Sequence, residues 1–378
     1  MQENWQQLID NFDQTQRYVL AAIVETKGST YQKTGAHMLV NLQGECIGLL
    51  SGGCLEADIA LHAKEVFQTG ISQQVTYDLS ANADLLWGLG LGCDGALIIQ
   101  LQLLTPENEH RQFAQLLESV AQGQSGFYWL STQQNQAANS VLNWFQVIED
   151  SQQLSDIEQH TQNMQSQQAD FQGLCIPVRA ILSLVICGAG PDVAPVTEAC
   201  KQQGWKVSLW DHRAPYLQQP VFVHVNAKRK VRPENISHAA EFNCFDGAIL
   251  MTHNLTFDQQ YLAQLLQSSV GYIGVLGPKA RLNKLVNNIE QQRNVSLTAA
   301  LTKNGSPRVY GPIGLDLGGR GPQAIALSIA AQIQQHFYQQ EESAKPNKTG
   351  SNTAQRICAQ HVNYHQQLTM EKQQHASC

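Results

Sequence analysis

The chain has 378 residues, of which 43% are hydrophobic, and it carries a formal net charge of −7. Its length predicts two domains, and its acidic balance argues against a protein held on nucleic acid by a basic surface. The start of the chain shows no apolar signal-peptide core, and no apolar run reaches the roughly 20 residues that a membrane helix needs. We therefore expect a cytoplasmic protein that binds neither nucleic acid nor a membrane.

Cysteine usage fits the same compartment. The chain has nine cysteines, with no Cys-x-x-Cys pair and no dense spacing. In a reducing compartment such cysteines are free thiols. For each of them, a small buried hydrophobic residue is the competing structural interpretation.

Apolar periodicity predicts mixed α and β structure in the first half of the chain. We expect helices over residues 5–16, 55–67 and 107–122, and strands over 18–26, 36–41, 46–50, 75–79 and 96–103. The Gln-, Asn- and Ser-rich stretch from 124 to 171 has one apolar run at 141–148, which predicts a closing hairpin and then a flexible linker from about residue 150. Together these elements predict an N-terminal α+β domain over residues 1–175.

Two glycines and a cysteine directly precede the helix predicted at residue 55. Gly52 and Gly53 let the backbone lie close to a ligand, and free N–H groups at this point suit an anion. Cys54 lies near the helix N-terminus, where the dipole favours a thiolate that ligates a soft metal or carries sulfur as a persulfide. Glu56 is a candidate acid or base, or a complement to the helix dipole. A buried structural thiol is the competing interpretation for Cys54.

A second glycine-rich loop carries Cys93 and feeds the strand predicted at 96–103. Glycines on both sides of this cysteine indicate close backbone approach or unusual dihedral angles. Both loops adjoin core strands of one domain, so we expect them to converge on one pocket. The alternative is two tight turns that contain small residues.

A dinucleotide-binding βαβ unit is predicted from residue 183 to residue 213. Gly188 permits the tight turn after the first strand, and Gly190 lets the backbone approach a pyrophosphate at the helix N-terminus. Asp211 ends the second strand 21 positions after Gly190, close to the roughly 20 expected for a ribose-binding acid. The third glycine position of the fingerprint holds Val193. A Rossmann scaffold kept for its shape is therefore the competing interpretation.

Polar residues follow later strands of the same predicted sheet. His253 ends a strand predicted at 246–253, and Arg213 follows the ribose-site acid, so both are candidate ligand residues at the carboxyl edge. For His253 a hydrogen-bonded structural role competes with catalysis. Lys279 and Arg281 follow a glycine turn and are candidates to hold phosphate or carboxylate. We predict an α/β Rossmann-like domain with a doubly wound parallel sheet over 176–340, and a disordered polar tail over 341–378.

Several motifs occur together in this chain. In the first half they are Gly28-Ser29-Thr30, Gly35-Ala36-His37-Met38-Leu39-Val40, Ser51-Gly52-Gly53-Cys54-Leu55-Glu56 and Gly90-Leu91-Gly92-Cys93-Asp94-Gly95. In the second half they are Cys187-Gly188-Ala189-Gly190-Pro191, Asp211-His212-Arg213, Tyr272-Ile273-Gly274-Val275-Leu276-Gly277 and Pro312-Ile313-Gly314-Leu315-Asp316-Leu317-Gly318. With this set the chain resembles the XdhC/CoxI family of xanthine dehydrogenase accessory factors, over about residues 18–331.

The resemblance implies a maturation factor for another enzyme. Such a factor binds the molybdenum cofactor (molybdopterin), promotes exchange of Mo=O for Mo=S with a cysteine desulfurase, and hands the product to an apo xanthine-dehydrogenase-type hydroxylase. It implies Cys54 as a molybdenum ligand or transient sulfur carrier, Glu56 as a neighbouring proton handler, and Cys93 in the same pocket. The Rossmann half is then expected to bind a nucleotide, or the nucleotide-like part of the cofactor, through Gly188, Gly190, Asp211, Arg213 and His253.

This chain departs from the family pattern at two places. Tyr31-Gln32 stands where the family commonly has Pro-Arg, and Asp94 stands where a glycine is usual. Two other functions stay open: an NAD(P)-dependent oxidoreductase with His253 as acid or base, and a nucleotide-sensing regulatory module. We expect a homodimer on the general frequency of such assemblies.

Overall fold

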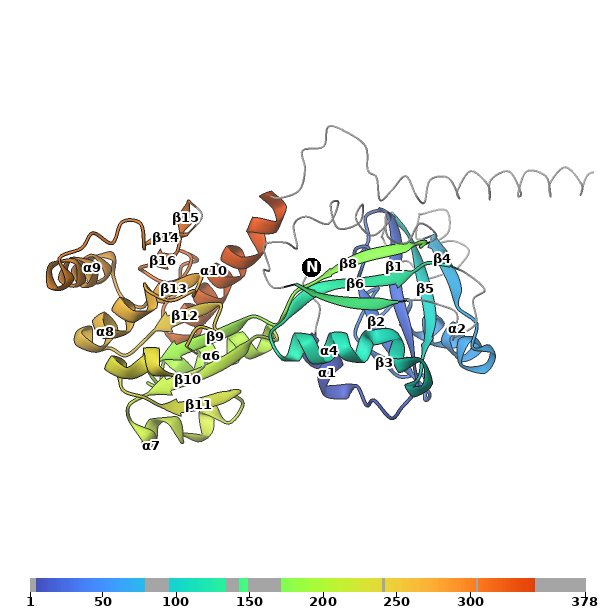
Figure 1. Ribbon diagram of the computed structural model, residues 1–378, viewed down its shortest axis with the longest axis horizontal. Coiled ribbons are helices and arrows are strands. Elements are labelled where there is room, and N and C mark those ends of the chain that lie inside the picture. Colours follow the sequence, from blue (N-terminus) through green and yellow to red (C-terminus); the bar gives the residue numbers. More distant parts are fainter. Residues whose placement is uncertain are drawn as a thin grey trace, which may run out of the picture.

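The computed structural model describes residues 5–78, 95–133, 143–148, 171–239, 242–303 and 305–343. These residues form two lobes, one with antiparallel sheets from the first half of the chain and one with a parallel sheet from the second half (Figure 1). The Lys206 ammonium group, on a strand of the second lobe, donates a hydrogen bond to the Ala121 carbonyl of the first. The predicted boundary at residue 175 falls within a strand of the first lobe. Cys93, most of the expected linker and the tail beyond residue 343 lie outside the described residues.

The first lobe is built on a five-stranded antiparallel sheet with the order β3-β2-β1-β5-β4. Its strands are β1 (Tyr18–Gly28), β2 (His37–Asn41), β3 (Cys46–Ile47), β4 (Gln73–Asp78) and β5 (Gly95–Leu104). Successive side chains of β1 alternate between two buried clusters. One cluster lies under helix α2 (Glu56–Thr69), and the other lies under α1 (Trp5–Asn11) and α4 (Phe113–Ala121). This double burial explains why β1 is a continuous apolar run.

A three-stranded antiparallel sheet packs on the same buried cluster as α1 and α4. It consists of β6 (Ser125–Ser131) between β7 (Trp144–Ile148) and β8 (Gly173–Val178). The predicted apolar run at 141–148 supplies β7, which pairs with β6 as a hairpin. The third strand was not predicted, because it follows the polar stretch that the sequence assigned to a linker.

The single helix predicted at 107–122 is wrong. The structure has a short 3-10 segment η1 (Pro106–Gln112) and then α4, because Glu109, His110, Arg111 and Gln112 all have positive φ angles between 46° and 59°. Two contacts from side chains to backbone carbonyl groups hold this bend. The Arg111 guanidinium donates to the Leu103 carbonyl at 2.9 Å, and a ring nitrogen of His110 lies 3.0 Å from the Gln16 carbonyl.

The second lobe has a six-stranded parallel sheet with the order β11-β10-β9-β12-β13-β16. Its strands are β9 (Ser183–Cys187), β10 (Lys206–Asp211), β11 (Ala227–Lys230), β12 (Gly247–Leu250), β13 (Tyr272–Val275) and β16 (Val309–Tyr310). Helices α6 (Val193–Gln202) and α10 (Pro322–Ser343) pack together on one buried cluster, and α8 (Leu255–Leu265) and α9 (Lys279–Arg293) on the other. The predicted doubly wound Rossmann-like fold is therefore confirmed.

The strand order fixes where a ligand site is expected in this lobe. The chain leaves β9 toward β10 and β11 on one side, and returns to β12 on the other. In such sheets the crevice outside the carboxyl ends of the strands, at this reversal, is the ligand site. The glycine turn after β9 and the polar residues after β12 both lie there. Within the described ranges, no helix is long and apolar enough to cross a membrane.

Candidate functional site

The loop before α2 is shaped by glycines. Gly52 and Gly53 have φ angles of 76° and 98°, a region that residues with a Cβ rarely adopt. A Cβ at Gly53 meets nothing within 4 Å, whereas one at Gly52 would lie 3.3 Å from the Tyr31 ring. The loop therefore rests on Tyr31, whose side chain is 61% exposed. Tyr31, one of the two departures from the pattern of the family that the chain resembles, thus places an aromatic ring beside the loop.

The Glu56 carboxylate closes this loop from the first turn of α2. One oxygen accepts backbone N–H groups of Leu50 at 2.9 Å and Ser51 at 2.8 Å. The other accepts the Ser51 hydroxyl at 2.5 Å and the Leu55 N–H at 3.2 Å. Both ends of the loop are therefore fixed to a single side chain, for which the sequence offers a role as acid or base or as a complement to the helix dipole, but not this one.

These contacts set the charge state of Glu56. Partial burial raises the pKa of its carboxyl group, but the hydrogen bonds from Ser51, Leu50 and its own backbone outweigh burial and hold the pKa below its usual value. The group is ionised at neutral pH and acts as a hydrogen-bond acceptor. Its position at the start of a helix also suits a negative charge.

Two cysteines lie near this loop and differ in access. Cys54 is exposed, whereas Cys46 on β3 is half-buried with its Sγ 3.6 Å from the Glu56 carbonyl oxygen. Burial, together with the Glu56 carboxylate, raises the pKa of the Cys46 thiol. Cys54 is therefore the thiol that the loop presents to solvent.

The turn at residues 28–31 links the first cysteine loop to the start of β5. A Cβ at Gly95 would lie only 2.4 Å from the Ser29 carbonyl oxygen, so β5 begins in close contact with this turn. The same turn carries Tyr31, on which Gly52 rests. Cys93 itself lies outside the described residues, and convergence of the two cysteine loops stays a prediction.

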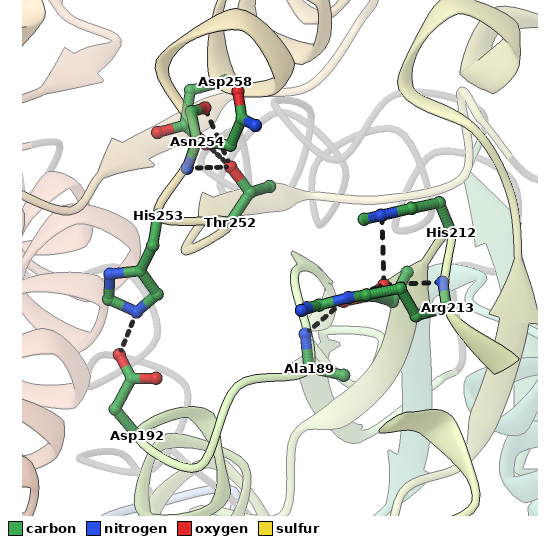
Figure 2. A network of polar contacts seen from close by, with 9 residues as sticks. Ala189, Asp192, His212, Arg213, Thr252, His253, Asn254 and Asp258 are labelled. Carbon is green, nitrogen blue, oxygen red and sulfur yellow. Dashed lines mark hydrogen bonds and ion pairs between the residues drawn. The ribbon is translucent and has the colours of Figure 1, made fainter. Parts of the chain in front are cut away.

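The second glycine turn is held by tertiary contacts (Figure 2). Gly188 has a φ angle of 118°, and a Cβ there would lie 2.4 Å from the Met251 carbonyl oxygen after β12. The next residue, Ala189, donates its N–H to the Asp211 carboxylate at 2.8 Å. Gly188 is thus required both by its backbone angle and by close packing on the neighbouring strand.

The Asp211 side chain is 2% exposed and has both oxygens engaged. Besides Ala189, it accepts the Arg213 backbone N–H at 2.8 Å and two guanidinium N–H groups at 3.0 and 2.8 Å. Burial raises the pKa of this carboxyl, but the bonds from Arg213 and Ala189 outweigh it and lower the pKa. The Arg213 guanidinium also lies 3.7 Å over the Tyr216 ring. The predicted ribose acid and its arginine therefore bind each other in this structure.

An acid that sequence inspection missed lies beside Gly190. Asp192 Oδ1 lies 2.7 Å from where a Cβ of Gly190 would be, and its Oδ2 lies 2.9 Å from His253 Nε2. Figure 2 shows the two side chains pointing toward each other. His253 has a φ angle of 57°, a strained value for a residue with a Cβ. A carboxylate thus lies at the helix N-terminus where the sequence predicts an anion.

Of the two basic residues predicted after β13, Arg281 is bound within the protein and Lys279 is exposed to solvent. Arg281 donates to the buried Asp258 carboxylate at 2.7 and 3.2 Å, and Thr252 donates to the same carboxylate at 2.5 Å. Arg281 therefore holds a carboxylate of its own chain. Lys279, at the first position of α9, is exposed.

The fold and these two loops define a two-lobed protein that joins a Rossmann domain to an antiparallel domain with a cysteine-bearing glycine loop. A family model described as the XdhC Rossmann domain matches residues 184–333, and one described as the XdhC and CoxI family matches residues 12–78. The chain belongs to the XdhC and CoxI family.

Three relatives extend this finding. The chain is 29% identical over 326 residues to a Bacillus subtilis strain 168 protein named as a probable xanthine dehydrogenase subunit, covering 83% of this chain and 92% of that protein. It is 31% identical over 86 residues to the molybdenum cofactor insertion chaperone PaoD of Escherichia coli K12, covering 23% and 26%. A crystal structure described as a xanthine dehydrogenase from Bacillus halodurans matches with a TM-score of 0.71 and 28% identity, over 91% of this chain and 98% of that one.

Proposed function

We propose that this protein is an accessory factor that binds the molybdenum cofactor and promotes its insertion into a xanthine-dehydrogenase-type molybdenum hydroxylase. Membership of the XdhC and CoxI family supports this proposal, as does the likeness to a relative named as a molybdenum cofactor insertion chaperone. The observation that carries it is the exposed Cys54 on a loop fixed at both ends by Glu56. The cofactor is cargo in this proposal, to be released to the client enzyme.

Cys54 is the residue to which we assign the cargo. A thiolate is a soft ligand suited to molybdenum and to sulfur chemistry. Its exposure leaves room for a large pterin ligand and for a second protein. For the sulfuration that the family resemblance implies, with a cysteine desulfurase as partner, Cys54 would be the residue that holds the metal centre.

Glu56 contributes as a positioning residue in this proposal. Its carboxylate is engaged by four donors around the loop, so it holds the backbone of residues 50–55 in one conformation. A fixed loop reduces the entropy lost when a ligand binds. The role as proton handler that the family resemblance implies stays a separate prediction for the same residue.

Two neighbours complete the proposed cargo site. The exposed Tyr31 ring lies against Gly52 and offers a flat face beside Cys54. Flat aromatic rings stack favourably with planar heterocycles such as a pterin. Cys93 precedes Gly95 by two residues, a chain length that spans at most about 7 Å, and Gly95 contacts the same turn as Tyr31. We therefore retain Cys93 as a proposed second thiol of this pocket.

The Rossmann lobe is proposed to bind a nucleotide or the nucleotide-like part of the cargo. The proposed contacts are Gly188, Gly190, Asp211, Arg213 and His253. The geometry favours the Asp211 side of the crevice, because the Asp192 carboxylate lies beside Gly190 at the helix terminus. An anion that binds at that terminus would have to displace the Asp192 carboxylate, or bind His253 together with it.

The test is co-expression in cells that make molybdopterin, rapid purification, and measurement of bound molybdenum and pterin. We expect close to one equivalent of each in the wild type and loss of most of both in Cys54→Ala. The matched control is Cys244→Ala, because Cys244 is also an exposed thiol but lies in the Rossmann lobe. Wild-type protein without molybdenum or pterin would contradict the proposal. Equal cofactor in wild type and Cys54→Ala would remove Cys54 from the site.

A further inference from the structure

A pocket unrelated to the cysteine loop lies at the far edge of the Rossmann sheet. It forms where β11 ends at Lys230 and the chain turns into the 3-10 segment η4 (Pro233–His238). Its volume is about 370 Å³. The lining residues are Arg229, Lys230, Val231, Arg232, Asn235, His238 and Ala239.

The pocket is basic within an acidic protein. Four of the five residues from 228 to 232 are Lys or Arg, although the whole chain carries a net charge of −7. Lys230 and Arg232 are exposed at its rim. Arg232 pairs with Glu234 at 3.9 Å, and both side chains are well exposed to solvent. Such a surface pair is weak, so the positive charge is available to a ligand.

The pocket lies at the end of the strand next to the one that ends at the predicted ribose acid. β11 pairs in parallel with β10, with Lys230 opposite Asp211. The Val231 N–H donates to the Asp211 carbonyl at 3.1 Å. Neighbouring strands lie roughly 4.8 Å apart, so the backbone of Lys230 lies beside that of Asp211 at the carboxyl edge of the sheet, where ligands bind in this fold.

Part of the Arg213 guanidinium is already engaged within the protein. It is bound to Asp211 through two N–H groups and stacks on Tyr216. In Rossmann domains a nearby arginine accommodates the 2′-phosphate of an NADP-type nucleotide. In this chain exposed cations also lie at the end of β11, one strand further along the sheet.

We propose that the pocket formed by Lys230, Arg232, Asn235 and His238 binds the phosphomonoester of a cofactor whose adjoining ring lies at Asp211. A dianionic phosphate matches two long cations and an amide donor in a concave site. A 2′-phosphorylated adenine nucleotide and a pterin phosphate both carry this group. The inference rests on the Rossmann lobe alone and stands apart from the proposal for Cys54.

The test is isothermal titration of the full chain with three probes: 2′-AMP, 5′-AMP and a 6-hydroxymethylpterin phosphate. We expect at least one phosphomonoester probe to bind, and to bind about tenfold or more weakly to the variant Lys230→Gln/Arg232→Gln. Its affinity should also fall as salt rises, because the contact is between charges. Selective binding of 2′-AMP over 5′-AMP assigns the site to a 2′-phosphorylated nucleotide, and selective binding of the pterin probe assigns it to a pterin phosphate.

The control variant Lys201→Gln/Lys284→Gln makes the same charge change at two exposed helix positions outside the pocket. It should bind the probes as the wild type does. All substituted residues are exposed, so each variant should keep the wild-type melting temperature. Equal affinities in the pocket variant and the wild type, or no binding of any probe, would overturn the inference. Molybdenum content of the Cys54 variants is a separate readout, so failure of one proposal leaves the other to be judged alone.

Discussion

The molecule contains two glycine turns before helices, each held by a carboxylate, and they differ in how they are held. At residues 50–55 the carboxylate is Glu56, at most six positions from the backbone groups it binds. At residues 188–190 it is Asp211, 22 positions from Ala189 and on another strand. We call the Glu56 contacts the local clamp and the Asp211 contacts the tertiary clamp. The local clamp leaves the Cys54 thiol exposed, whereas the carboxylate of the tertiary clamp is itself buried at the carboxyl end of β10. The first is suited to presenting a reactive group, and the second to fixing the shape of a crevice.

Substituting the glycines should give the largest difference between the two turns. Gly188→Ala should lower the unfolding free energy by about 3 kcal/mol or more, because its methyl group meets the Met251 carbonyl at 2.4 Å. Gly53→Ala, where a Cβ meets nothing within 4 Å, should lower it by only about 1–2 kcal/mol of backbone strain. Urea denaturation measures both. Equal losses would show that packing does not distinguish the turns.

Removing each carboxylate should follow the same order, with the larger loss again at the turn held by Asp211. Asp211→Asn removes the charge that Arg213 binds, and because Arg213 is 36% exposed the unfolding free energy should fall by only about 2 kcal/mol. Glu56→Gln exchanges an acceptor for a donor facing backbone N–H groups and should lower it by about 1–2 kcal/mol. Hydrogen exchange should rise at residues 50–55 in the Glu56 variant and remain as in the wild type around residue 189. Faster exchange at both turns would contradict two independent clamps.

Acid should weaken the tertiary clamp. Burial opposes ionisation of Asp211, but the bonds from Arg213 and Ala189 lower its pKa below the unfolded value of about 3.9. A lowered folded pKa contributes stability above the unfolded value, and this is lost as pH falls through the folded pKa. The melting-temperature gap between wild type and Asp211→Asn should therefore be constant at neutral pH and should narrow as pH falls below the unfolded pKa of about 3.9. A gap that stays constant below that pH would show that the charge of Asp211 is not what stabilises the turn.

Thiol reactivity should show the smallest effect and the most local one. Cys54 is exposed, whereas Cys46 is half-buried and its thiol pKa is raised by burial and by Glu56. Iodoacetamide at neutral pH should therefore modify Cys54 roughly tenfold faster than Cys46. Peptide mass spectrometry over a time course gives both rates in one sample. Faster labelling of Cys46 would indicate that the loop does not present Cys54 as described.

Much of the fold was predictable because it depends on local apolar patterns. The run at 18–26 is buried on both faces in β1, and the unit from 183 to 213 has the expected strand, turn, helix and strand. The edge strand β11 was missed because its four residues are Ala-Lys-Arg-Lys, which carry no apolar signal. The break at residues 109–112 was missed because it depends on contacts of Arg111 with a carbonyl eight positions away and of His110 with one 94 positions away.

The candidate sites divide in the same way. The Ser-Gly-Gly-Cys-Leu-Glu motif contains its own clamp, so the sequence could predict a shaped loop with Cys54 at its tip. Asp192 and His253 pair although they lie 61 positions apart, and no local sequence pattern predicts such a contact. A usable signal was present in each half: an acid directly before a helix, and a polar residue just past a core strand. Only the fold brings the two together.

The most direct test of the central claim is loading of a client enzyme. A xanthine-dehydrogenase-type hydroxylase should be produced in cells that lack this protein and then supplied with wild type, Cys54→Ser or Cys244→Ser. Our account predicts that the hydroxylase gains molybdenum and activity with the wild type and with the Cys244 variant, and gains little of either with Cys54→Ser. A hydroxylase that is equally loaded and active without this protein, or with all three forms of it, would contradict the account.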